Sequence, residues 1–267
     1  MTTEAFAPAK INLSLHVTGQ RDDGYHLLDS LVAFADIGDR LWFDSAPDMR
    51  IDVSGPFAKG VPTDARNLVW QAADLAGWCG RIRLEKNLPH GAGIGGGSAD
   101  AAAVLRAFGA GVDAIALGAD VPVCLRSIPQ RMAGIGDVLE TLKPIPDIQV
   151  VLVNPKVIVP TKQVFDALNS KRNPPMSGEL PTFSNAVEFC DWLRCQRNDL
   201  EKPARVIAPQ IDTVLEALDD ALIARMSGSG ATCFGLYAES ASTAAARIAQ
   251  AHPDWWVASG RLISLFG

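Results

Sequence analysis

The chain has 267 residues, of which 48% are hydrophobic and 20% are charged, and its formal net charge is -6. This length and composition are typical of a globular protein with one large domain or two medium ones. The acidic balance argues against a broad nucleic-acid surface, which usually needs an excess of Lys and Arg.

Two further features of the sequence concern the cellular compartment of the protein. No apolar run reaches bilayer-spanning length, and residues 1–17 lack the apolar core of a signal peptide. Five scattered cysteines without a C-x-x-C pair predict reduced thiols rather than a zinc site or a disulfide framework. We therefore expect a cytoplasmic protein without a membrane partner or a nucleic-acid partner.

The hydrophobic pattern of the first half predicts mostly strands. Alternating apolar and polar residues predict them at 6–16, 27–46, 49–55 and 81–86. Within the second of these segments, Gly38 and Asp39 are expected to divide the strand in two. Residues 19–26 are rich in Gly and Asp, which is typical of a turn. Helical spacing of apolar residues predicts helices at 65–78 and 98–108.

The pattern changes near Pro144 and Pro146, where we expect the boundary between two lobes. Beyond it, the predicted elements are a strand at 148–155, a helix at 161–168, a loop at 171–184, a helix at 209–220, a strand–glycine turn–strand at 221–239, a helix at 241–252 and a strand at 254–262. The mixture of helices with hairpin-like strands predicts an α+β fold in two lobes. The predicted domains are residues 1–147 and 148–267.

The segment LPHGAGIGGGSADAAAVL, residues 88–105, joins a predicted strand to a predicted helix through a glycine run. Backbone N–H groups of such a loop, together with the positive end of the helix dipole, are suited to bind a di- or triphosphate. Ser98 stands where the helix begins. Its hydroxyl either caps the helix or binds a phosphate-bound Mg²⁺, and the sequence leaves both alternatives open.

Three known phosphate-binding motifs fit this segment poorly. Gly91-x-Gly93-x-x-Gly96 matches the dinucleotide fingerprint, but it follows antiparallel-looking strands instead of opening a βαβ unit. The Walker pattern fails because no Lys-Ser or Lys-Thr follows the glycines. The protein-kinase set fails because the sequence contains neither H-R-D nor D-F-G. None of these three motifs therefore accounts for the segment.

Asp120 and Lys10 are candidates for acid–base chemistry. Asp120 precedes Val121-Pro122, where Asp is a good helix cap, but a carboxylate beside an acceptor hydroxyl can also take its proton. Lys10 lies mid-strand between apolar neighbours, so it either faces solvent or is buried with a carboxylate or phosphate partner. Asn12 shares a strand face with Lys10 and is a candidate polar contact.

Three segments, in order, resemble the motifs of the GHMP kinases, the superfamily of galactose, homoserine, mevalonate and phosphomevalonate kinases. They are PAKINLSLHV at 8–17, LPHGAGIGGGSADAAAVL at 88–105 and MSGSGATCFGLY at 226–237. Within that superfamily, GQRDDGYHLLDSL, LGADVPVCL and NPKVIVPTKQVF resemble the kinases of 4-diphosphocytidyl-2-C-methyl-D-erythritol. The resemblance covers nearly the whole chain, and residues 107–118 are shorter than the family pattern.

The resemblance implies a role for each motif. Lys10 and Asp120 match the catalytic pair, with Asp120 as the general base. Asn67 matches a residue near the adenine pocket, although its position also suits a helix N-cap. The residues implied to surround the ATP phosphates are Pro89, His90, Gly91, Ala92, Gly93, Ile94, Gly95, Gly96, Gly97, Ser98 and Ala99. The residues implied to bind the substrate are Asn12, Tyr25, His26, Lys86, Thr161 and Phe165.

The aromatic residues among the implied substrate-binding residues would recognise the head group of the substrate. Tyr25 and His26 are either ordinary turn residues or part of a cytosine site, and Phe165 matches an aromatic residue on the opposite face of the base. The implied reaction is ATP-dependent phosphorylation of the 2-hydroxyl of 4-diphosphocytidyl-2-C-methyl-D-erythritol, giving the 2-phosphate and ADP, in non-mevalonate isoprenoid precursor biosynthesis.

Two other functions remain as alternatives to this one. The first is another GHMP kinase, of the homoserine or mevalonate type. The second is a nucleotide-binding sensor that has lost catalysis, and the presence of both Lys10 and Asp120 argues against it. We expect a monomer or a weak homodimer whose partner is the small-molecule substrate.

Overall fold

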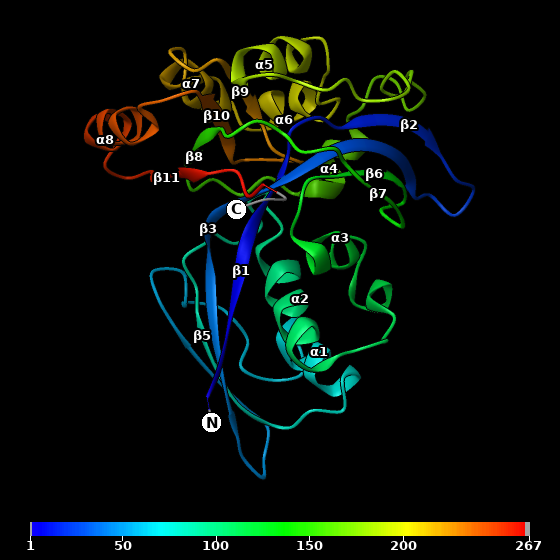
Figure 1. The fold of residues 1–267 in the computed structure, drawn as a ribbon, viewed down its shortest axis with the longest axis vertical. Coiled ribbons are helices and arrows are strands. Elements are labelled where there is room, and N and C mark those ends of the chain that lie inside the picture. The colour runs from blue at the N-terminus through cyan, green and yellow to red at the C-terminus, as the bar shows by residue number, and fades with distance from the viewer. Residues whose placement is uncertain (1, 265–267) are drawn as a thin grey trace. The chain divides into compact units, whose positions relative to one another are not determined.

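The structure, a computed structural model, describes residues 2–264 and divides into two compact units (Figure 1). The first unit comprises residues 2–10, 38–90 and 95–127, and the second comprises residues 11–37, 91–94 and 128–264. Helices and sheets occur together, so the predicted α+β class is confirmed. Each unit draws on several stretches of the chain, and the domain limits 1–147 and 148–267 stay a prediction.

The first unit combines strands with packed helices. Its elements are the first part of β1 (Thr3–Asn12), the second part of β3 (His26–Ser45), β4 (Arg50–Ser54), α1 (Leu68–Leu75), β5 (Gly80–Glu85), α2 (Gly96–Phe108), the 3₁₀ helix η1 (Ala114–Leu117) and α3 (Val121–Arg126). β5 pairs antiparallel with β3 and parallel with β4. Phe43 on β3 meets Phe108 of α2 edge-on, with ring centroids 5.0 Å apart. Through this contact α2 packs against β3. α2 also packs on α1 and α3.

β3 is one strand of 20 residues, so the predicted break at Gly38 and Asp39 is wrong. Gly38 serves close packing rather than a turn, because a Cβ there would collide with the carbonyl of Ala7 on β1 and with the ring of Phe6. The Asp39 side chain is fully buried, and its carboxylate accepts backbone hydrogen bonds. Residue types that form turns elsewhere thus serve tertiary contacts here.

The strand predicted at 6–16 is divided, because β1 ends at Asn12 and β2 (His16–Gln20) follows as a separate strand. Leu15 lies between them and exchanges backbone hydrogen bonds with Arg197 and Asp199 instead of continuing the first strand. The turn expected at 19–26 lies at residues 21–25.

The second unit contains a four-stranded antiparallel sheet in the order β11-β8-β10-β9. Its elements, besides β2 and the remaining parts of β1 and β3, are β6 (Gln130–Gly134), β7 (Val138–Thr141), β8 (Gln149–Asn154), α4 (Thr161–Asp166), α5 (Ala186–Arg194), α6 (Glu201–Ile207), α7 (Gln210–Ala217), β9 (Ile223–Met226), β10 (Cys233–Tyr237), α8 (Ala241–Ala251) and β11 (Trp256–Arg261). β6 pairs with the first part of β3 and with β7.

The sequence patterns missed β6, β7, η1, α3, α5 and α6. β7 is short and mostly exposed, so it lacks the apolar alternation that marks a half-buried strand. α6 carries Pro203 in its first turn, where proline is tolerated although it usually signals a break. The other predicted elements are confirmed with bounds that differ by no more than three residues at each end, and residues 171–184 form the predicted loop.

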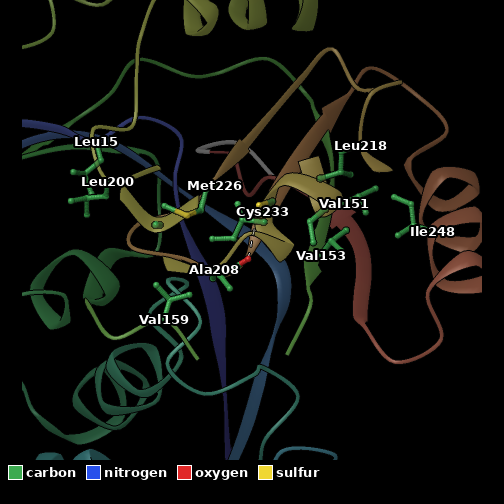
Figure 2. Close-up of a cluster of buried hydrophobic side chains, with 14 of the residues drawn as sticks. Leu15, Val151, Val153, Val159, Leu200, Ala208, Leu218, Met226, Cys233 and Ile248 are labelled. Atoms are coloured by element: carbon green, nitrogen blue, oxygen red, sulfur yellow. Dashed lines mark hydrogen bonds between the residues drawn. The ribbon is translucent and has the colours of Figure 1, made fainter. Parts of the chain in front are cut away.

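β8 lies at the centre of the second unit's hydrophobic core. Figure 2 shows this cluster, which includes Val151, Val153, Leu218, Met226, Cys233 and Ile248. Val150 and Leu152 alternate with the two β8 valines and are also fully buried, so both faces of the strand are covered. This burial explains why the strand is an uninterrupted apolar run. Within residues 2–264, the structure contains no helix of the length and apolarity that membrane crossing requires.

Candidate active site

Lys10 and Asp120 form an ion pair in the first unit. Lys10 Nζ lies 2.6 Å from Asp120 Oδ1, although the two residues are 110 positions apart. Lys10 is 4% exposed on β1, whereas the Asp120 side chain is 39% exposed. The solvent-facing alternative for Lys10 is therefore wrong, and burial with a carboxylate partner is confirmed.

Asp120 occupies the N-cap position of α3, but its side chain does not cap the helix. It makes no hydrogen bond to the helix backbone, and its Oδ1 accepts instead from Lys10. The short segment before it forms η1, whose own N-cap, Asp113, accepts from Ile115 N. One carboxylate oxygen of Asp120 is thus held by an ammonium, while the side chain keeps access to solvent.

α2 begins beside this pair. Its N-cap, Gly95, has a left-handed backbone with φ of 63°, and a Cβ there would lie 3.2 Å from Lys10 Cβ. Ser98 is the third residue of α2, so the alternative that Ser98 caps the helix is wrong. The Ser98 side chain is half-buried in the first helical turn. The predicted contact of its hydroxyl with Mg²⁺ stays a prediction.

Residues 89–95, which we call the glycine segment, have a left-handed backbone at alternate positions from Gly91 to Gly95. The φ angle is 57° at Gly91, 74° at Gly93 and 63° at Gly95. Alternation of this kind is typical of nests, in which backbone N–H groups surround an anion. A Cβ on Gly91 would meet nothing within 4 Å, so this position borders open space. The side chain of His90 is engaged elsewhere, because Nε2 lies 2.5 Å from the carbonyl oxygen of Phe57.

The glycine turn between β9 and β10 packs on the glycine segment within the second unit. Ser227 Oγ donates to the Gly93 carbonyl at 2.9 Å and accepts from the Asn12 N–H at 3.0 Å. A Cβ on Gly228 would lie 2.9 Å from the Gly93 carbonyl oxygen. Asn12 also donates through its side chain to Ser30 Oγ at 2.8 Å. Residues of the three sequence motifs therefore meet at this turn.

Asn198 secures the same turn, and sequence patterns did not identify it. Its Nδ2 donates to the carbonyls of Met226 and Gly228, at 2.8 and 2.9 Å, and its Oδ1 accepts from Leu200 N. Asn198 is buried, and it lies in the segment of the chain that joins α5 to α6. The sequence Arg-Asn-Asp-Leu looks like an ordinary loop before a helix, so only the fold reveals this role.

Thr161, a predicted substrate contact, lies at the start of α4. Its hydroxyl is 2.8 Å from Ser229 Oγ, which belongs to the same glycine turn. On the other side of the turn, Asn154 donates to Thr232 Oγ1 at 2.9 Å. The fold thus brings Thr161 to the glycine turn, and its contact with a substrate stays a prediction.

His26 and Phe165 stack on each other in the second unit, with ring centroids 4.6 Å apart and an interplanar angle of 25°. Among the described residues, His26 Nε2 is buried without a hydrogen-bond partner. Burial, with a smaller contribution from the charge of Lys171, lowers the pKa of His26. Tyr25 is 60% exposed in the preceding turn. The structure therefore joins His26 with Phe165 and leaves Tyr25 facing solvent.

Lys86 is buried between two carboxylates of the first unit. Its Nζ donates to Asp39 Oδ2 and, at 2.6 Å, to Asp100 Oδ2. Burial alone would lower the pKa of Lys86, but the charges of Asp100 and Asp39 outweigh it and raise this pKa. Burial raises the pKa of Asp100 above its ordinary value, and the charge of Lys86 opposes this shift. The predicted ligand contact of Lys86 stays a prediction.

Asn67 is the N-cap of α1. Its Oδ1 accepts from Val69 N at 2.9 Å, and its Nδ2 donates to the Pro62 carbonyl at 2.7 Å. The capping alternative is confirmed, and proximity to an adenine stays a prediction. Within residues 2–264, no group of three or more His, Cys, Asp or Glu residues is arranged to hold a metal ion.

Two family models match the chain. The model described as GHMP kinases N terminal domain matches residues 67–126, and the model described as GHMP kinases C terminal matches residues 180–254. These segments include the glycine segment and the Asp120 region in the first match, and the second glycine turn in the other.

The chain is 57% identical over 265 residues to the 4-diphosphocytidyl-2-C-methyl-D-erythritol kinase of Dinoroseobacter shibae, covering 95% of this chain and 92% of that protein. The kinase of the same name from Ruegeria pomeroyi is 52% identical over 279 residues, and the match covers 98% of this chain and 100% of that protein.

Solved structures show the same relationship. A crystal structure of 4-(cytidine 5'-diphospho)-2C-methyl-D-erythritol kinase matches with a TM-score of 0.73 and 33% identity, covering 97% of this chain and 99% of that one. A homoserine kinase from Cytophaga hutchinsonii shares the fold, with a TM-score of 0.62 and 17% identity over 98% of this chain and 95% of its own. Because identity above one half extends over nearly the full length, the chain belongs to the 4-diphosphocytidyl-2-C-methyl-D-erythritol kinases, a family of GHMP kinases.

Proposed function

We propose that this protein transfers the γ-phosphoryl group of ATP to the 2-hydroxyl of 4-diphosphocytidyl-2-C-methyl-D-erythritol, giving the 2-phosphate and ADP. The observation that carries the proposal is the ion pair of a buried Lys10 with a partly exposed Asp120 beside the start of α2. The names of the relatives supply the substrate. In the family resemblance described above, this reaction belongs to non-mevalonate isoprenoid precursor biosynthesis.

Asp120 acts as the general base in this proposal. Its Oδ1 is held by Lys10 at 2.6 Å, which orients the carboxylate and leaves the other oxygen for the acceptor hydroxyl. The hydroxyl proton moves to Asp120 as its oxygen attacks the γ-phosphorus, and the bond to the β-phosphate oxygen of ATP breaks. Lys10 contributes an ammonium beside the developing negative charge.

The glycine segment binds the phosphates of ATP through its backbone. Support comes from the left-handed φ angles at Gly91, Gly93 and Gly95 and from the helix start that follows them. Mg²⁺, when bound, neutralises phosphate charge. With no cluster of metal-binding side chains in residues 2–264, the ion would depend mainly on phosphate oxygens, and the Ser98 hydroxyl would be a protein ligand.

The cytidine head group is assigned to the second unit. His26 supplies a buried ring nitrogen without a partner, and Phe165 supplies an aromatic face. Because these two rings stack on each other, the base would either stack on an outer face of the pair or separate the rings. Thr161 and Asn12 are the further polar contacts that we assign to the substrate, and Tyr25 would have to close over the base from its exposed position.

A coupled assay of ADP release tests the function directly. Purified protein is offered ATP and Mg²⁺ with 4-diphosphocytidyl-2-C-methyl-D-erythritol, mevalonate or homoserine as the alcohol. We expect turnover with the first alcohol and none with the other two, and phosphorus NMR should place the new phosphate on the 2-hydroxyl. Turnover with mevalonate or homoserine alone would instead assign the protein to another GHMP kinase activity. Nucleotide binding without turnover of any alcohol would support the sensor alternative.

Oligomeric state and compartment complete the proposal. We assign a monomer or a weak homodimer in the cytoplasm, on the basis of the acidic composition and scattered cysteines of the sequence. Sedimentation velocity over a range of protein concentrations tests the first assignment, and fractionation of the producing cells tests the second.

A further inference from the structure

Three charged side chains are buried together in the first unit, at the two ends of the glycine segment. Asp39 on β3 is 0% exposed, Lys86 after β5 is 3% exposed and Asp100 on α2 is 2% exposed. We call them the buried triad. Lys86 stands in the middle and donates to both carboxylates. Charged residues are seldom buried unless they are paired, so this arrangement needs an explanation.

Asp39 fixes the chain where it enters the glycine segment. Its Oδ1 accepts from the backbone N–H groups of Asn87 and Leu88, at 2.5 and 2.9 Å. Its Oδ2 accepts from Lys86. One carboxylate on a neighbouring strand therefore holds three consecutive residues, of which the last directly precedes the segment that begins at Pro89.

Lys86 extends this connection to the chain where it leaves the glycine segment. Its ammonium reaches Asp100 Oδ2 at 2.6 Å, in the second turn of α2. A Cβ on Gly96, the first residue of α2, would lie 3.6 Å from Lys86 Nζ and 3.7 Å from Asp39 Oδ2. The triad therefore lies directly against the start of the helix whose N–H groups face the phosphates in the proposed function.

Stability alone does not explain the triad. Buried ion pairs lose so much hydration that apolar side chains of similar volume are often as good or better for stability. Asp100 Oδ1 is moreover buried without a hydrogen-bond partner among the described residues, which is a further cost. What the triad does supply is directional contact between three chain segments, and such contacts specify position.

We propose that Asp39 and Asp100, acting through Lys86, are positioning residues that hold both ends of the glycine segment in the ATP-binding conformation before ATP arrives. The inference rests on the proposed function only in taking ATP as the ligand of this segment. It assigns Lys86 to the protein framework rather than to substrate binding. Preorganisation of a loop increases affinity because less ordering remains to be done on binding.

Substitution of Asp100 tests the proposal through nucleotide affinity. In Asp100→Ala, the Kd of a non-hydrolysable ATP analogue and the KM for ATP should rise about 10- to 100-fold. The reason is that a smaller fraction of the molecules has the glycine segment in the ATP-binding conformation before ATP binds. At saturating ATP, kcat should change far less, and the KM for the alcohol should stay as in wild type. Asp100→Asn keeps an oxygen that accepts from Lys86 and should restore most of the affinity.

The matched control is Asp52→Ala, which removes an ion-paired aspartate of β4 in the same unit. It should leave the affinity for the ATP analogue unchanged. Analogue binding is measured by calorimetry without any alcohol, so the result does not depend on which alcohol the enzyme phosphorylates. A folded Asp100→Ala variant with wild-type analogue affinity overturns the proposal, as does a loss confined to kcat.

Hydrogen exchange on the wild-type protein provides a second test that needs no variant. If the triad positions the segment in advance, the amides of 87, 88 and 99–100 should be protected without nucleotide, and the ATP analogue should add little. If these amides exchange freely and become protected only with the analogue, the segment is ordered by ATP and the proposal is wrong.

Discussion

Replacement of Asp120 by Asn separates proton transfer from every other role of this residue. The amide has nearly the shape of the carboxylate, and its oxygen can still accept from Lys10, which now lies 2.6 Å from Asp120 Oδ1. What disappears is the negative charge and the ability to take a proton. The variant therefore keeps the local geometry and removes the base.

The structure sets the expected magnitudes. Loss of a general base is typically worth about 10² to 10⁴ in kcat, or roughly 2.7 to 5.4 kcal/mol in the barrier. The Asp120 side chain is 39% exposed and caps no helix, so the stability change should be small, about 1 kcal/mol from the weakened ion pair. The affinity for an ATP analogue should stay within about threefold of wild type, because no phosphate-binding group is altered.

The assay is the coupled measurement of ADP release with 4-diphosphocytidyl-2-C-methyl-D-erythritol, together with calorimetry of the ATP analogue and a thermal melt. Asp113→Asn is the matched control. It is the same substitution in the same segment, on a residue that caps η1 and that Asn replaces well as a cap. It should have wild-type turnover.

Near wild-type turnover in Asp120→Asn would refute the assignment of the base, and solvent or the γ-phosphate would then have to accept the proton. A loss of ATP-analogue affinity equal to the loss of kcat would also refute it, because the residue would then act in nucleotide binding.

Gly95→Val should lower both melting temperature and turnover, because φ of 63° costs a branched residue about 1–2 kcal/mol and its Cβ would press on the side chain of Lys10; a folded variant with unchanged turnover would contradict this. His26→Ala and Phe165→Ala should each lower kcat/KM for the cytidine-linked substrate by about 1–3 kcal/mol while analogue affinity is kept. Wild-type enzyme that phosphorylates free methylerythritol equally well would disprove the head-group assignment. His16 has a pKa lowered from 6.5, chiefly by burial and then by Arg197, so the unfolded chain binds more protons below about pH 6.5. Stability should therefore fall as the pH drops through that value, and chemical denaturation at several pH values should show a weaker dependence in His16→Gln; an equal dependence would exclude His16 as its source.

Local patterns of the sequence predicted most of the elements and the glycine segment. The glycine run at 91–97 followed by an alanine-rich helix needs no tertiary information, because left-handed φ angles and helix propensity are properties of neighbouring residues. The apolar run of β8 likewise predicted a buried strand. β7 is mostly exposed, so its sequence lacks the apolar alternation that predicts a half-buried strand.

Which polar groups meet was decided only by the tertiary structure. Local rules allowed Asp120 to be a helix cap, Lys10 to face solvent and Asp39 to belong to a turn. The fold instead pairs the first two across 110 positions and buries the third, whose carboxylate accepts from the N–H groups of Asn87 and Leu88. The partner of a buried charge comes from whichever segment packs against it, and no periodicity of one segment encodes that partner. The buried triad and the role of Asn198 could therefore not be predicted from the sequence. Each depends on hydrogen bonds between segments that are far apart in the chain, and local hydrophobic patterns do not specify which segments pack together.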